Sequence, residues 1–175
     1  MKKIVIVCGL IGGLVVILPM LLLTDACYKD GNFEGGMVIG YTSMLLAFSM
    51  VFVGIRNYRN KYNNGLISFG KAFKVGFFIV LIASTIYVIA WLISYYNFMP
   101  DFAEKYGMHM INQLKASGAS QAKIDAATKE MADFAVMYKK PYYVILFTYI
   151  EIVPVGLLVT LISSLILKRK KAVAA

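Results

Sequence analysis

A chain of 175 residues has the length of a single domain. Hydrophobic residues make up 60% of it, against about 45–50% in soluble domains, and they gather in long uncharged runs that exclude an ordinary water-soluble fold. The net charge of +9 would suit a nucleic-acid-binding protein, but the basic residues lie between the apolar runs, a distribution that indicates membrane topology instead.

Four segments are long enough to cross a bilayer, which takes about 20 residues for about 30 Å of hydrocarbon. These spans are residues 4–24, 37–55, 75–96 and 142–167. The first three carry no charged residue, and the fourth carries only Glu151. We therefore expect an all-α integral membrane bundle of four transmembrane helices, forming one membrane domain over residues 1–175.

The first run could instead be a signal peptide. Lys2 and Lys3 precede it, and residues 24–27 read TDAC, which ends in Ala-Cys as a lipoprotein cleavage site does. However, its apolar length exceeds that of a signal peptide, and Thr24 and Asp25 do not suit the cleavage site. A retained helix is the favoured interpretation.

Small residues recur four positions apart in the spans, a spacing that lets helix backbones approach closely in lipid. The helix-packing positions predicted in this way are the pairs Gly9–Gly13, Gly36–Gly40 and Gly156–Thr160. Packing within the chain is favoured over a dimer face, which leaves a homo-oligomer open.

Charge predicts the orientation of the spans. The segment 56–74 carries +5 without an acid, and with both termini this side totals +11, whereas the loops on the other side carry −2 and +1. By the positive-inside rule both termini are expected in the cytoplasm. Anionic lipid head groups at that face are the expected contacts of the basic residues, and nucleic acid is not an expected partner.

The loop between the third and fourth spans is the only one large enough for structure of its own. From Asp101, apolar residues recur at Phe102, Tyr106, Met110 and Leu114, which predicts one helix. A second apolar stripe runs through residues 124–138 after Gly118 and Ser120, a natural helix stop and start. The pair predicts a helical hairpin over about residues 101–139. It could be a packed cap on the bundle or a docking surface for a protein partner.

Glu151 is the one residue of a charged type within a span. It lies nine residues after Tyr142, about 13 Å into the membrane. Tyr87 is expected at the same depth in the third span, and Tyr41 somewhat nearer the outer surface. A carboxylate at mid-membrane is costly without a partner, so Glu151 is expected to be neutral or hydrogen-bonded. It could serve a proton- or cation-responsive site, helped by Pro154, or only a structural hydrogen bond.

No other chemistry emerges from the residue pattern. The sequence contains no nucleophile–base set, no phosphate-binding glycine loop and no metal-ligand spacing, and His109 is interpreted as an ordinary helix residue. We therefore predict no catalytic, cofactor-binding or metal site, and a protein that is not an enzyme. Glu151, Tyr87 and Tyr41 form the candidate intramembrane polar site.

Three stretches resemble a known family of bacterial membrane proteins, the domain of unknown function 4199. They are GYTSMLLAFSMVFVGIRNYRNKYNNGLISFGKAFKVG (40–76), the ASGAS–IDAATKEM loop, and EIVPVGLLVTLISSLILKRK (151–170). The resemblance covers nearly the whole chain. It implies a small inner-membrane protein with four spans and hence a periplasmic hairpin, and it carries over no catalytic residue.

Two functions follow as hypotheses. The leading one is a non-enzymatic inner-membrane protein that acts through membrane or periplasmic protein partners, or on the envelope. The alternative is a small oligomeric transporter or channel subunit that uses Glu151. A cavity reaching Glu151 would favour transport, and an exposed apolar face on the hairpin would favour partner binding.

Overall fold

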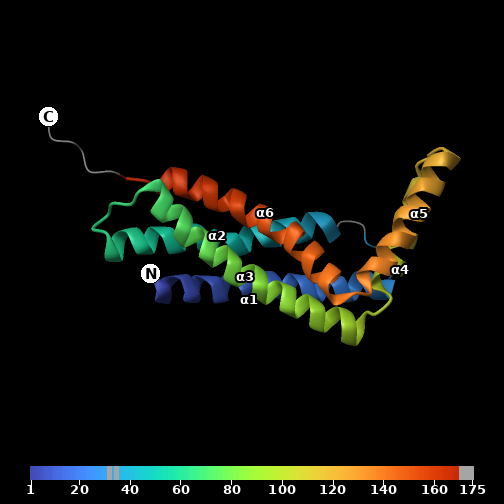
Figure 1. The fold of residues 1–175 in the computed structure, drawn as a ribbon, viewed down its shortest axis with the longest axis horizontal. Helices are drawn as coiled ribbons and strands as arrows, with labels where there is room; N and C mark the ends of the chain where they lie inside the picture. Colours follow the sequence, from blue (N-terminus) through green and yellow to red (C-terminus); the bar gives the residue numbers. More distant parts are fainter. Residues whose placement is uncertain (31–32, 34–35, 170–175) are drawn as a thin grey trace.

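The computed structural model describes residues 1–30, 33 and 36–169. Glu34 in the loop between the first two spans and Lys170 and Lys171 in the basic tail contribute to the predicted charge balance, and they lie outside these described residues. The described residues form six helices and no extended sheet (Figure 1): α1 (Lys2–Asp30), α2 (Gly36–Tyr62), α3 (Phe69–Phe98), α4 (Phe102–Ala116), α5 (Gln121–Tyr138) and α6 (Pro141–Leu167). The predicted all-α class is confirmed.

Helices α1, α2, α3 and α6 are each long and apolar enough to cross a membrane. They contain the four predicted spans, and the protein is a multi-pass membrane protein. Three of them extend several residues beyond the apolar run, because the helical hydrogen bonds continue into polar sequence. For example, α3 begins at Phe69, directly after Ser68, whose side chain accepts a hydrogen bond from the Lys71 amide.

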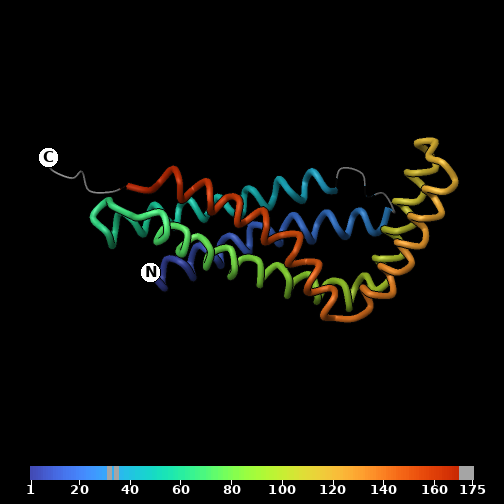
Figure 2. Tube along the Cα trace, turned by 45° about the horizontal axis from the view of Figure 1, so that its top comes forward, coloured from blue at the N-terminus to red at the C-terminus, as the bar shows by residue number. Residues whose placement is uncertain are grey.

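The four long helices run along the longest axis of the molecule, and the α4–α5 hairpin stands at one end (Figures 1 and 2). We call this the hairpin end. The opposite end, here the basic end, holds the start of α1, the α2–α3 turn and the end of α6. Residues 67 and 169 pair there through both backbone amides, with N–O distances of 3.0 and 2.9 Å. This pairing fastens the α2–α3 turn to the end of α6.

Close helix contacts pack the half of the bundle toward the basic end. A methyl group added at Gly9 or Gly13 of α1 would lie 2.7 and 2.9 Å from isoleucine side chains of α3. At Gly156 of α6 it would lie 2.4 Å from Val80 and 2.9 Å from Phe48. These glycines therefore sit where helix backbones come closest. The second GxxxG pair does not: Gly40 has open space in front of it, and Gly36 has only Cys27 Sγ, at 3.8 Å.

The hairpin forms as predicted between spans three and four. Gly118 has a φ of +70°, the left-handed conformation that ends α4 readily at a glycine, and Ser120 is the residue before α5. Gly107 of α4 faces Met131 of α5, and because the glycine has no side chain the two helices can approach closely there. The buried Tyr138 joins the hairpin to the bundle, since Trp91 Nε1 of α3 donates a 2.8 Å hydrogen bond to its hydroxyl.

Candidate functional site

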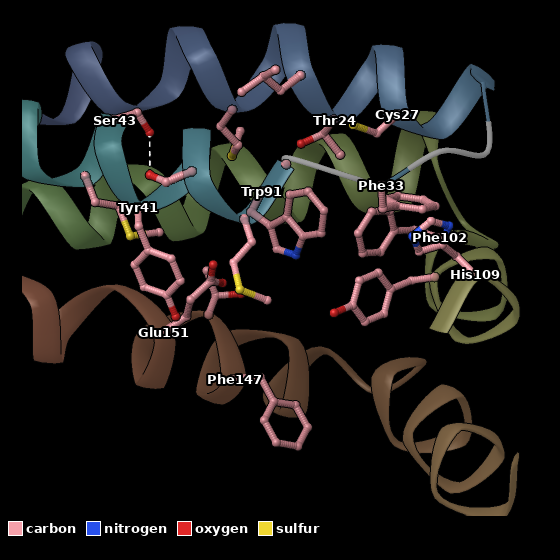
Figure 3. Close-up of a pocket in the computed structure, with 18 of the residues that line it drawn as sticks. Thr24, Cys27, Phe33, Tyr41, Ser43, Trp91, Phe102, His109, Phe147 and Glu151 are labelled. Carbon is pink, nitrogen blue, oxygen red and sulfur yellow. Dashed lines mark hydrogen bonds between the residues drawn. The ribbon is translucent and has the colours of Figure 1, made fainter. Parts of the chain in front are cut away.

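A cavity of about 660 Å³ opens in the half of the bundle toward the hairpin end. Helices α1 to α6 all contribute to its wall (Figure 3). The lining residues are mostly aromatic, methionine or small: Met20, Leu23, Thr24, Cys27, Phe33, Gly36, Met37, Gly40, Tyr41, Ser43, Met44, Tyr87, Trp91, Phe102, Tyr106, His109, Met110, Gln113, Phe134, Tyr138, Phe147, Thr148 and Glu151.

The cavity exists because α2 contacts α6 at one level and leaves room at another. Phe48 of α2 meets α6 at Gly156, where no side chain keeps the helices apart. Nearer the hairpin end, residues 36–44 of α2 line the cavity together with residues 147–151 of α6. Gly40 adds to the space, because it presents no side chain there. The contact at Gly156 therefore closes the cavity toward the basic end.

The three residues of the predicted polar site, Glu151, Tyr87 and Tyr41, all line this cavity. Glu151 and Tyr41 are exposed, and their side chains point into the space between α6 and α2 (Figure 3). Tyr87 of α3 is 8% exposed and forms part of the inner wall. Within the described residues, no hydrogen bond or ion pair reaches the Glu151 carboxylate. Its side chain is open to whatever occupies the cavity.

Aromatic side chains outside the predicted polar site form much of the wall. Trp91, Phe147 and Tyr138 line the cavity beside Glu151. The hydrogen bond from Trp91 to Tyr138 fixes the indole ring, and burial raises the pKa of Tyr138 to about 12, which keeps the phenol neutral. In the sequence, a grouping of aromatics at the outer ends of spans three and four, such as Trp91, Tyr95 and Tyr142, is the signal that could have indicated this wall.

A second aromatic group closes the cavity at the hairpin end. The Phe33 ring packs edge-on against Phe102, Tyr106 and His109 of α4, with centroid distances of 5.6, 5.6 and 5.5 Å. His109 thus lines the cavity as a packed ring, at the hairpin end of the wall (Figure 3). The segment between α1 and α2 contributes to this wall through Phe33.

A polar cluster fastens α1 to the hairpin beside this aromatic group. The Tyr28 hydroxyl donates to the Asp101 carboxylate, and Lys105 Nζ lies 3.4 Å from the same carboxylate and 3.7 Å from the centroid of the Tyr28 ring. The hydrogen bond from Tyr28, followed by smaller contributions including Lys105, holds the pKa of Asp101 below its usual value. The Asp101 carboxylate therefore contacts both α1, through Tyr28, and α4, through Lys105.

The site offers one carboxylate and no cluster for a metal. No group of three or more His, Cys, Asp or Glu side chains suited to a metal occurs in the part of the chain that the structure describes. Both cysteines are free thiols, Cys8 buried in the bundle and Cys27 in the cavity wall. The arrangement can bind a molecule through apolar contact, aromatic faces and a single acid.

Comparison with curated proteins and with solved structures gives no match. The family model described as "Protein of unknown function (DUF4199)" matches residues 6–169, which covers the hairpin and all four spans except the first few residues of α1. The chain belongs to the DUF4199 family.

Proposed function

We propose that this protein binds a small molecule in the cavity between α2 and α6, as a transporter-type membrane protein. The observation that carries the proposal is a cavity of about 660 Å³ that reaches the one intramembrane acid. Small-molecule sites typically measure about 300–1,000 Å³ and are mostly apolar with a few polar groups. The cavity matches this pattern in size and in lining.

The proposed role is non-enzymatic. Glu151 is the only carboxylate among the described lining residues, whereas hydrolytic chemistry commonly uses a pair of acids. Cys27 and His109 also lie in this wall, but no hydrogen bond among the described residues joins them as a nucleophile and its base. One acid in an aromatic wall is better suited to recognition. Transport would require the contact at Gly156 to open, because it closes the cavity toward the basic end.

Gly40→Phe tests the proposal directly. A side chain at this position meets no atom within 4 Å at its Cβ, so a phenyl group can enter the cavity without displacing the fold. The only tryptophan of the chain, Trp91, lies in the wall and reports occupancy by its fluorescence. We expect a saturable change in emission when small amphiphiles of different charge are titrated into protein held in lipid nanodiscs. Gly40→Phe should abolish it.

Gly70→Phe is the matched control, since Gly70 also has open space but lies at the basic end. It should respond as the unmodified protein does. An emission change that persists in Gly40→Phe, or no saturable response to any amphiphile, would reject the cavity as a binding site. Vesicle uptake of a bound compound, compared with Glu151→Gln, would then separate transport from binding alone.

The orientation proposed with this role places the basic end in the cytoplasm and the hairpin in the periplasm of a bacterial inner membrane. Five basic residues without an acid lie between positions 56 and 74, at the end opposite the hairpin. Labelling with an impermeant maleimide checks it, with single cysteines introduced at Ser117 and Asn60 in a variant whose Cys8 and Cys27 are replaced by serine. Only Ser117→Cys should react in intact spheroplasts.

The partner-dependent hypothesis also has a supporting observation. Met108 and Val136 of the hairpin are 57% and 64% exposed, although the stripe residues Ile124 and Tyr138 are buried. Crosslinking in vivo from positions 108 and 136 tests for a protein partner. Capture of one defined protein from both positions, with no ligand response at Trp91, would favour the partner role over the cavity.

A further inference from the structure

The charge balance of the cavity is one-sided. Among the described residues that line it, Glu151 is the only acid, and none is a lysine or arginine. The ion pairs among the described residues all lie near the hairpin end, at Asp25, Asp101 and Glu104. A carboxylate in a low-dielectric site is stabilised strongly by a nearby positive charge. None of the described lining residues supplies that charge, so we assign it to the ligand.

The wall favours a cation with an apolar body. Tyr41, Tyr87 and Trp91 present aromatic rings beside Glu151, and the faces of such rings attract cations within about 6 Å. Met20, Met37 and Met44 add flexible, polarisable surface that adapts to irregular apolar shapes. Carboxylate, aromatic rings and methionines together describe recognition of an organic cation.

The same wall is poorly suited to a bare metal ion. Hard cations such as Ca²⁺ take about six to eight oxygen ligands. Among the described lining residues only Glu151 offers a carboxylate, and the other side-chain oxygens are neutral hydroxyls and the Gln113 amide. A volume of about 660 Å³ would also leave a single ion loosely held. Size and ligand count both favour an organic molecule.

From this juxtaposition of Glu151 with Tyr41, Tyr87 and Trp91 in one cavity, we infer that the ligand is a hydrophobic organic monocation. The inference rests on the proposed function, since it names the class of molecule for that cavity. Glu151 neutralises the positive charge, the aromatic rings surround it, and the apolar part fills the space toward Met37 and Phe102.

Tetraphenylphosphonium is a suitable probe, because tetraphenylborate has nearly the same shape and the opposite charge, and triphenylphosphine oxide is neutral. Binding is measured by equilibrium dialysis against protein in nanodiscs of zwitterionic lipid, with empty nanodiscs subtracted. We expect saturable binding of tetraphenylphosphonium and none of tetraphenylborate. Glu151→Gln should weaken binding of the cation by at least about tenfold. It should leave triphenylphosphine oxide unchanged within about twofold.

Two variants keep the result interpretable. Glu151→Asp retains the charge and should keep most of the affinity, which distinguishes loss of the charge from loss of the fold. Glu130→Gln makes the same chemical change on the exposed face of α5 and should have no effect.

Equal binding of the three probes, or binding of the cation that is unaffected by Glu151→Gln, would overturn the ligand class. If Gly40→Phe still abolished that binding, the proposed function would stand. Absence of binding by every probe, or binding unaffected by Gly40→Phe, would overturn both.

Discussion

Gly156 and Gly40 both lie on spanning helices, yet their surroundings differ completely. A methyl group at Gly156 would lie 2.4 Å from Val80, whereas one at Gly40 would meet no atom within 4 Å. The same contrast separates the two halves of the bundle. Toward the basic end, glycines bring backbones together, and toward the hairpin end they leave a cavity. Small residues in a membrane helix thus serve packing in one half and space in the other.

The half with tight packing has buried side chains of nearly zero exposure, such as Phe48, Val51 and Ile79. In the half with the cavity a few lining residues are exposed, among them Met37, Tyr41 and Glu151. The hairpin closes this half through Tyr138 and the Asp101 cluster. A tightly packed half toward the basic end and an accessible cavity toward the hairpin end suit a protein that binds a ligand. Single substitutions in either half test this difference in packing.

The largest effect is expected from Gly156→Leu. Its side chain cannot fit between Val80 and Phe48 without moving α2 or α3 away from α6, and we expect the free energy of unfolding to fall by about 3 kcal/mol or more. Thermal denaturation in one detergent measures it. Gly40→Leu is the matched control and should keep or slightly raise the midpoint, because it removes a helix glycine in open space. Equal losses of stability in Gly156→Leu and Gly40→Leu would contradict the difference in packing between the two halves.

A smaller effect is expected from Tyr138→Phe. The substitution leaves the buried Trp91 N–H without its 2.8 Å acceptor, at a cost of about 1–3 kcal/mol. The hairpin should loosen, and protease cleavage within residues 117–120 should become faster. Tyr142→Phe changes an exposed tyrosine and should leave the cleavage rate as it is. No difference between the two variants would mean that the hydrogen bond does not hold the hairpin.

The smallest effect is expected at Asp101, which is exposed. The hydrogen bond from Tyr28 lowers the pKa of Asp101 in the folded state, so its contacts contribute stability above its ordinary pKa. That contribution is lost as the pH falls through the lowered value, below about pH 4. Trp91 packs against Phe102, with ring centroids 5.0 Å apart, and its emission should shift over this range.

Asp101→Asn is the control for this titration. It should give the low-pH emission already at neutral pH, and the part of the transition that belongs to Asp101 should disappear. An identical pH profile in Asp101→Asn would assign the shift to another group.

Much of the fold was predictable from local sequence. Apolar length alone identifies the spans that became α1, α2, α3 and α6, because each must satisfy its backbone hydrogen bonds internally while facing lipid. The hairpin was predictable from a 3.6-residue periodicity on either side of Gly118. Counting residues from Tyr142 also placed Glu151 at the depth of Tyr87, and both residues line one cavity.

The sequence by itself therefore determined which segments are helices and which acid lies within a span, but three of the long helices extend six or seven residues beyond the predicted spans. Only the tertiary structure decided that Gly9, Gly13 and Gly156 lie at close contacts while Gly40 faces open space. All four occur in the same small-residue pattern. What differs is how each helix is rotated and tilted against its neighbours, and that is set by side chains far away in the chain, such as Phe48 and Val80 against Gly156.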